Sequence, residues 1–248
     1  MALVDEAIMK IRDLIRSGQL APGSRLPAEA QLAAELGMSR NSMREAVKVL
    51  EASKVLDVRR GDGTYVTSLS PDLLLGGLAF AVDLLDERYL LETVEVRRML
   101  EPAATAAAAS RVRPEQLAFL RTLLEYMQAS VSDAETMIQY DVEFHRAVVS
   151  AAGNETLSAM LESLSSATVR ARIWRGMIDA DAAQRTMTEH QAIYNALAAG
   201  DQAVAHAAAL VHVHTSERWL RHLTSGDPRP AAGTAAEAGS LRGSTARG

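Results

Sequence analysis

Residues 72–224 contain no alternation of apolar and polar residues long enough to form β-strands. Alanine is abundant while glycine and proline are sparse in the middle of the chain. This composition favours helix, because alanine loses no side-chain entropy when a helix forms. Short turn-rich breaks divide the segment into seven predicted helices: 72–85, 88–110, 114–129, 133–152, 154–176, 180–199 and 201–223. We therefore expect an all-α bundle of about seven helices.

The first 68 residues have a different pattern. An apolar stripe predicts a helix over 2–18, and two further helices are expected over 27–37 and 38–54. Residues 55–69 then alternate around Gly-Asp-Gly, which is typical of a β-hairpin, here with a basic tip. Two short helices joined by a four-residue turn and followed by a hairpin indicate a winged helix-turn-helix.

The predicted fold is therefore mainly α, with a winged helix-turn-helix followed by the helical bundle. We place the first domain at 1–68 and the second at 72–224. The remaining 24 residues, 225–248, include 18 Ala, Gly, Ser, Thr or Pro and are expected to be disordered.

The second helix of the helix-turn-helix predicts contact with DNA. With Ser39 as its N-cap, its first turn presents Arg40, Asn41, Ser42 and Arg44. Arginine suits guanine and asparagine suits adenine, while the helix N-terminus attracts phosphate. On the hairpin, Arg59 and Arg60 are positioned to reach the DNA backbone or the minor groove. Each piece alone is more often a solvated surface, so the residue pattern leaves both interpretations open.

Net charge supports DNA contact only locally. The whole chain has a formal charge of −5, but residues 1–67 have 10 Lys/Arg against 9 Asp/Glu. Residues 38–60 have six basic and three acidic residues. This local excess of positive charge matters more for phosphate contact than the total does.

Asp141 and His145 are four residues apart, which places them on one face of a helix. The other histidines are His190, His206, His212, His214 and His222. Imidazoles together with a carboxylate suit divalent metals such as zinc or nickel, and the carboxylate also admits manganese. An Asp/His pair at this spacing is more often an ordinary surface pair, so the spacing alone leaves a metal site and a structural role open.

The stretch "PGSRLPAEAQLAAELGMSRNSMREAVKVLEASKVLDVRRGDGTYV" closely resembles the N-terminal domain of the GntR family of bacterial transcription regulators. The resemblance implies DNA contacts by Ser39, Arg40, Asn41 and Arg44 of the recognition helix and by Arg60 and Gly61 of the wing. The sequence departs from the family at two positions. Ala30 stands where many members have a DNA-contacting arginine, and Lys54 stands where a glycine C-cap is usual.

The second half resembles the ligand-binding domain of the FadR subgroup of GntR regulators. The matching segments are "EVRRMLEPAATAAAA", "DVEFHRAVVSAAGN" and "EHQAIYNALAAGD", followed by a later histidine. In the metal-binding branch of that subgroup, the matching positions bind the ion; here they are Asp141, His145, His190 and His212. The resemblance excludes His214, which comes two residues late, and argues against an acyl-CoA effector.

The same resemblance makes Arg97 the residue that grips an effector carboxylate. The alternative for Arg97 is an intrahelical pairing with Glu101, four residues later. A bound divalent ion beside a guanidinium would attract an anion, and an organic acid that chelates through a carboxylate and a hydroxyl fits both.

The predicted function is a homodimeric transcriptional repressor. We expect it to bind a palindromic DNA operator. We expect a divalent metal, zinc with nickel or manganese as alternatives, and a hydroxy- or sugar-acid effector. Two other interpretations stay open: the metal itself is the signal, or the site belongs to a metal-dependent hydrolase. No general base is positioned by the sequence, so we expect a protein that is not an enzyme.

Composition also points to a cellular setting. The chain contains no cysteine and its N-terminus lacks the order of a signal peptide. Its longest apolar run, at 73–82, is too short to span a bilayer. We therefore expect a cytoplasmic protein with no membrane partner.

Overall fold

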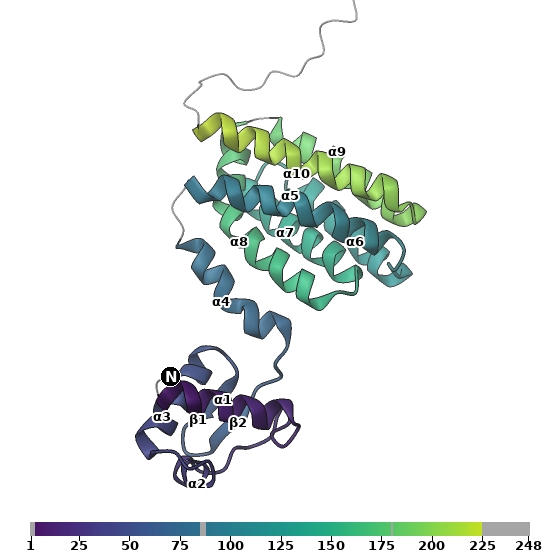
Figure 1. Ribbon diagram of the computed structural model, residues 1–248. Coiled ribbons are helices and arrows are strands. Elements are labelled where there is room, and N and C mark those ends of the chain that lie inside the picture. Colours follow the sequence, from purple (N-terminus) through teal and green to yellow (C-terminus); the bar gives the residue numbers. More distant parts are fainter. Residues whose placement is uncertain (1–2, 85–87, 180, 225–248) are drawn as a thin grey trace, which may run out of the picture.

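The computed structural model describes residues 3–84, 88–179 and 181–224 (Figure 1). Within these ranges it contains ten helices and one two-stranded antiparallel sheet, which confirms the mainly α class. The predicted tail at 225–248 lies outside the described residues, as do residues 85 and 180 at two predicted helix ends. No helix in the described ranges combines the length and apolar character needed to cross a bilayer.

The N-terminal part is a winged helix. Its elements are α1 (Leu3–Arg16), α2 (Glu29–Glu35), α3 (Arg40–Ala52), β1 (Leu56–Arg59) and β2 (Gly63–Val66). α1 and α2 both pack on α3, and the hairpin is attached through contacts between α3 and β1. The small core combines buried residues from all of these elements, among them Ile11, Leu32, Met43, Leu56 and Val66.

The two strands of the wing pair around a tight turn that contains two glycines. β1 pairs with β2 so that Leu56 faces Val66 and Arg59 faces Gly63. Gly61 and Gly63 have φ values of 78° and 139°, which L-residues with a side chain rarely adopt. The Gly-Asp-Gly sequence therefore sets the tight reversal of the chain.

α4 (Pro71–Asp83) lies between the winged helix and the bundle and packs against α8 (Figure 1). The bundle itself consists of α5 (Arg88–Ala109), α6 (Pro114–Ala129), α7 (Ala134–Ala151), α8 (Glu155–Ile178), α9 (Ala182–Ala199) and α10 (Gln202–Thr224). Together with α4 these are the seven helices predicted, with ends displaced by at most two residues.

Local signals in the sequence set the helix ends. Asp133 and Asn154 cap α7 and α8, because each side chain accepts a hydrogen bond from a backbone N–H of the first turn. Pro114 occupies the first turn of α6, where its missing N–H has no cost. Gly200 ends α9 in the left-handed conformation, with φ 67°.

The main core of the bundle places the candidate site. α5 contacts α7, α8, α9 and α10, so it runs along the centre of the arrangement. Phe144 of α7 is fully buried, and its ring meets His145 and His190 edge-on, with centroids 5.9 and 4.7 Å apart. Through these ring contacts, Phe144 packs His145 and His190 into the interior of the bundle.

Candidate metal centre and DNA-binding surface

The four predicted metal ligands meet in the interior of the bundle, although they come from three helices. They are Asp141 and His145 of α7, His190 of α9 and His212 of α10. One ligand atom from each lies within 4.8 Å of the others, and all four residues are buried. His206, His214 and His222 have exposed side chains. His212 is therefore buried while His214 is exposed, because residues two apart on a helix point in different directions.

The three imidazoles approach one another through the same ring atom. His145 Nε2 lies 3.1 Å from His190 Nε2 and 3.1 Å from His212 Nε2. Asp141 Oδ1 completes the group, 3.1 Å from His190 Nε2 and 3.7 Å from His145 Nε2. Ligands of a tetrahedral zinc ion, at about 2.0–2.1 Å from the metal, are roughly 3.3 Å from one another. The four distances above are close to this spacing, and all ligand atoms lie within 4.8 Å of one another.

The other ring nitrogen of each histidine, Nδ1, meets an oxygen atom. The partners are the Thr186 carbonyl for His190 at 2.7 Å, a Glu101 carboxylate oxygen for His145 at 2.7 Å, and a Glu189 carboxylate oxygen for His212 at 2.9 Å. Because carbonyl and carboxylate oxygens only accept, each neutral ring holds its proton on Nδ1 and a lone pair on Nε2. Three lone pairs facing one point repel each other unless a cation lies between them. The donor set therefore fits a metal ion, with outer partners of the usual kind.

Charges near the centre keep its groups in the metal-binding form. Burial would raise the pKa of Asp141, but the Arg172 guanidinium and the imidazoles outweigh it and hold that pKa well below its usual value. Burial lowers the pKa of His212 to about 4, against the opposing effect of Glu189. Metals bind ionised carboxylates and neutral imidazoles. Asp141 and His212 are in those forms at neutral pH.

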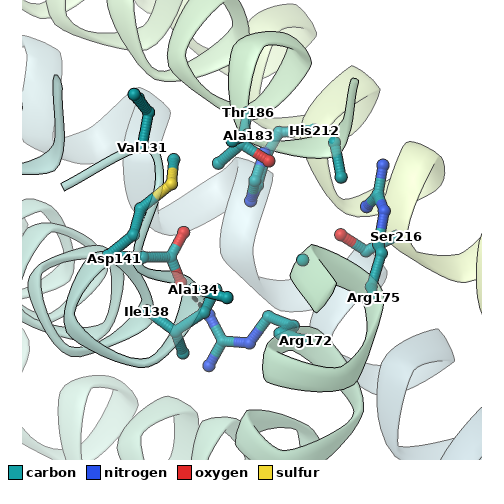
Figure 2. A pocket seen from close by; sticks show the side chains of 13 residues that line it. Val131, Ala134, Ile138, Asp141, Arg172, Arg175, Ala183, Thr186, His212 and Ser216 are labelled. Atoms are coloured by element: carbon teal, nitrogen blue, oxygen red, sulfur yellow. Dashed lines mark hydrogen bonds and ion pairs between the residues drawn. The ribbon is translucent and has the colours of Figure 1, made fainter. Parts of the chain in front are cut away.

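A narrow pocket lies beside the centre. Asp141 and His212 line one part of it, and Arg172 and Arg175 of α8 line another (Figure 2). Much of the remaining lining is small or apolar, and includes Ala134, Ile138, Gly176 and Ala183. A small molecule in this pocket would meet both candidate metal ligands and guanidinium groups: in Figure 2 Arg172 lies beside Asp141, and Arg175 lies near Ser216.

Arg97, the predicted effector-binding residue, is almost fully buried and has partners of its own. Its Nε and Nη2 donate to Glu101 Oε2 at 3.1 and 2.8 Å, and its Nη1 donates to Thr168 Oγ1 at 3.0 Å. This is the intrahelical pairing that the sequence left open. Arg97 lines a second, smaller pocket together with Arg172 and Arg175, and is not among the residues that line the pocket beside the metal ligands.

Sequence reasoning did not assign site roles to several residues that surround the centre. They are Glu101, Arg172, Arg175, Thr186 and Glu189. For Glu189 a signal existed, since it precedes His190 directly, and Glu101 was visible as the partner of Arg97. Arg172 gave no such signal, because its contact with Asp141 joins two separate helices.

The recognition helix α3 exposes most of the predicted DNA-contacting residues. Ser39 is the N-cap, and its Oγ accepts from the backbone N–H of Ser42 at 3.0 Å. Arg40, Asn41 and Arg44 are exposed on the first turns. Ser42 does not project with them: only 8% of it is exposed, and its hydroxyl lies 2.9 Å from that of Ser39. The structure thus differs from the expectation that Ser42 projects with its neighbours from the first turn, and a role of Ser42 at DNA stays a prediction.

The residues predicted on the wing differ in whether their side chains already have partners. Arg60 and Gly61 are exposed at the tip. Arg59 contacts Asp57 at 2.8 Å and lies over the Tyr65 ring at 4.2 Å, so a neighbouring carboxylate partly neutralises it. Ala30 is exposed on α2 and carries no charge. Lys54 adopts φ 59°, the left-handed conformation that glycine supplies without strain.

A winged helix joined to a helical bundle that can hold a ligand defines a class of proteins, the DNA-binding transcription regulators with a separate regulatory domain. Residues 3–66 match the family described as bacterial regulatory proteins, gntR family, and residues 92–215 match the FCD domain. The chain belongs to the GntR family and carries an FCD domain.

Similar proteins agree with this membership over nearly the whole chain. The galactonate operon transcriptional repressor of Escherichia coli K12 is 32% identical over 228 residues, 89% of this chain and 97% of that protein. The transcriptional regulator LutR of Bacillus subtilis 168 is 31% identical over 209 residues, 82% of this chain and 94% of LutR. The solved structure of Streptococcus agalactiae GntR has a TM-score of 0.64 and 27% identity, with 87% of this chain and 99% of that chain covered.

Proposed function

We propose that this regulator binds a divalent metal through Asp141, His145, His190 and His212, and that the metal holds a small hydroxy- or sugar-acid that controls operator binding. One observation carries the proposal: three buried imidazole Nε2 atoms and Asp141 Oδ1 converge, while each Nδ1 is occupied by an oxygen acceptor. Zinc suits this ligand set best, and nickel or manganese are the alternatives.

The chemistry of the pocket supports an acidic effector. An α-hydroxy acid chelates a metal through carboxylate and hydroxyl oxygens, and its remaining charge can be met by guanidinium groups. Arg172 and Arg175 line the pocket, and Arg97 lies behind them in the neighbouring one. The Escherichia coli relative is named for a galactonate operon, which agrees with a sugar acid as ligand.

On the DNA side, the proposed contacts are those of α3 and the wing. Arg40, Asn41 and Arg44 are exposed on the first turns of α3 and suit base edges and phosphates. We assign backbone contacts to Ser39, Arg59, Arg60 and Gly61. A two-fold homodimer of the domain at 72–224 would present two winged helices, from 1–68, to a palindromic operator as a cytoplasmic repressor.

A second function class is a metal-dependent hydrolase, in which the metal would activate a water and a free carboxylate beside it could act as general base. The carboxylates closest to the histidines are engaged: Glu101 with His145 and Arg97, and Glu189 with His212. Glu143, the other acidic residue near the ligands in sequence, is exposed. These positions favour a site that holds a ligand over one that hydrolyses it, and a protein that is not an enzyme.

Operator binding measured under three conditions tests the proposal. The full-length protein is compared after chelator treatment, after loading with zinc, and after zinc loading with a panel of acids that includes galactonate and lactate. We expect an acid to shift operator affinity only in the metal-loaded protein, and the same acid to raise its melting temperature. If zinc alone shifts operator affinity and no acid does, the metal is the signal. Turnover of an acid would instead support the hydrolase.

A further inference from the structure

A short segment before α2 extends the sheet of the wing. Arg25 forms an antiparallel bridge with Tyr65 of β2, and the backbones of residues 24–26 and β2 exchange hydrogen bonds of 2.8 and 2.9 Å. β2 pairs with β1 along its other edge. The wing therefore has a third member, which comes from the turn between α1 and α2 and places Arg25 beside the hairpin.

The two faces of this small sheet differ in character. One face is buried in the core of the winged helix through Leu26, Leu56 and Val66. Side chains alternate along a strand, and residues paired directly across strands point to the same face. The opposite face is therefore turned away from the core, and its side chains are those of Arg25, Asp57, Arg59 and Tyr65.

The guanidinium of Arg25 lies over Gly63, near the tip of the wing. A Cβ atom at position 63 would come within 2.6 Å of Arg25 Nε and 3.1 Å of its Nη2. A side chain there would have to displace the guanidinium, so the glycine leaves open the place that Arg25 occupies. Because Arg25 pairs with Tyr65, its side chain reaches along β2 toward the exposed tip residues Arg60 and Gly61.

The positive charge of Arg25 is not compensated within the described ranges. Arg59, on the same face, forms an ion pair with Asp57 at 2.8 Å and lies over the Tyr65 ring. Arg25 is exposed, and its side chain has no carboxylate partner among the described residues. A guanidinium already held in place can bind a phosphate through two hydrogen bonds with little further loss of side-chain entropy.

We propose that Arg25 binds a phosphate of the DNA backbone beside the tip of the wing, and that Gly63 keeps the place of its guanidinium open. This assignment rests on the proposed function, because it adds a residue to the DNA contacts assigned there. A phosphate contact carries no base preference of its own, but it makes binding more dependent on salt.

A salt titration of DNA binding tests the assignment. The probe is a duplex that the full-length wild-type protein selects from a random-sequence library, and its Kd is measured from about 50 to 200 mM KCl. The variants are Arg25→Ala and Arg25→Lys. Arg12→Ala, an exposed arginine of α1, is the matched control for the loss of one charge. Circular dichroism and melting temperature check that each variant is folded.

In Arg25→Ala, the slope of log Kd against log salt concentration should fall by about 0.9, the value for one phosphate contact. Its Kd at about 100 mM salt should rise roughly threefold to tenfold. Arg25→Lys keeps the charge and should stay close to the wild-type slope, and Arg12→Ala should match wild type. A wild-type slope in Arg25→Ala overturns the assignment. An equal loss in Arg25→Lys also overturns it, because the role of Arg25 would then be packing on the wing.

Arg40→Ala in the same titration separates this assignment from the proposed function. If Arg40→Ala weakens binding and Arg25→Ala does not, only the role of Arg25 is overturned. If the wild-type protein selects no duplex, the proposed DNA contacts fail, and the assignment with them.

A crystal structure of the wild-type protein with the selected duplex gives a readout that does not depend on variant folding. The Arg25 guanidinium should lie within hydrogen-bond distance of a phosphate oxygen. A guanidinium that contacts no phosphate in the complex overturns the assignment.

Discussion

At the scale of single residues, the candidate metal centre depends on which nitrogen of each histidine faces inward. His145, His190 and His212 all turn Nε2 to the centre because an oxygen acceptor holds Nδ1. The acceptors are two carboxylates and one carbonyl, and these oxygens set the orientation of the three rings. The site is therefore prepared by residues that would not touch the metal.

His190→Ala should remove metal binding, because it deletes the ligand that lies closest to both Asp141 and His145. The loss should exceed the roughly 10–100-fold cost of removing an outer partner. Zinc content after dialysis, measured by mass spectrometry, checks this. His214→Ala is the matched control, since that histidine is exposed two residues from His212, and it should keep its zinc. Equal zinc content in both variants would contradict the ligand assignment.

Arg40→Ala should strongly weaken operator binding while leaving zinc content unchanged, because Arg40 is exposed at the start of α3. Figure 1 shows α3 in the winged helix, apart from α7, α9 and α10, which carry the candidate metal ligands. Fluorescence anisotropy with operator DNA measures the effect, and loss of one base contact costs about 1–3 kcal/mol. Arg218→Ala, an exposed arginine of α10, should bind DNA like wild type. Unchanged affinity of Arg40→Ala would show that α3 does not read the operator as assigned.

At the scale of elements, the recognition helix is held by its first turn. Ser39 accepts a hydrogen bond from the Ser42 backbone and meets the Ser42 hydroxyl. Met43, Val47 and Leu50 then anchor the opposite face in the core of the winged helix. The cap thus sets both where the helix begins and which side chains face outward.

Ser39→Ala should lower the free energy of unfolding by about 1 kcal/mol, the usual cost of losing an N-cap, and should weaken operator binding. Urea denaturation followed by circular dichroism measures the first effect. Ser150→Ala, at an exposed position inside α7, should have no comparable cost, because alanine is favourable there. Equal stability of the two variants would mean that the cap does not hold α3.

At the scale of the whole molecule, buried titratable groups make the free energy of unfolding depend on pH. The pKa of His212 is lowered to about 4 from its ordinary value of 6.5 because the ring is buried. Between these values the unfolded chain binds a proton that the folded chain does not. The stabilisation is therefore complete above pH 6.5 and is lost as the pH falls toward 4.

The metal-free protein should lose stability between pH 6.5 and 4 by up to about 1.4 kcal/mol per pH unit from this residue. Urea denaturation at pH 7.5, 6.5 and 5.5 measures the slope. In His212→Asn the contribution of this group should disappear and the slope should be smaller. The lowered pKa values of Asp141 and Glu101 act at more acidic pH: the unfolded carboxylates begin to take up protons near their ordinary pKa values of 3.8 and 4.5, and the stabilisation is lost as the pH falls toward the lowered folded values. An unchanged slope in His212→Asn would assign the pH dependence to other groups.

Sequence by itself determined the class of this protein and most of its elements. Several helix and turn boundaries are local signals, among them the N-caps Asp133 and Asn154, the C-terminal Gly200 of α9 and the glycines of the wing. They depend on hydrogen bonds and backbone conformation within a few residues, so they act independently of how the helices pack. The four candidate ligands were also recognisable, because their spacing along separate helices matched that of a known family.

Tertiary structure alone decided what surrounds those ligands. Arg172 reaches Asp141 and Glu101 reaches His145 only because α5, α7 and α8 pack together, and no spacing in the sequence encodes such contacts between helices. Packing also turned Ser42 inward and gave Arg97 its partners. Helix periodicity defines the faces of each helix, but the direction in which a side chain finds its partner depends on how the helices are placed against each other.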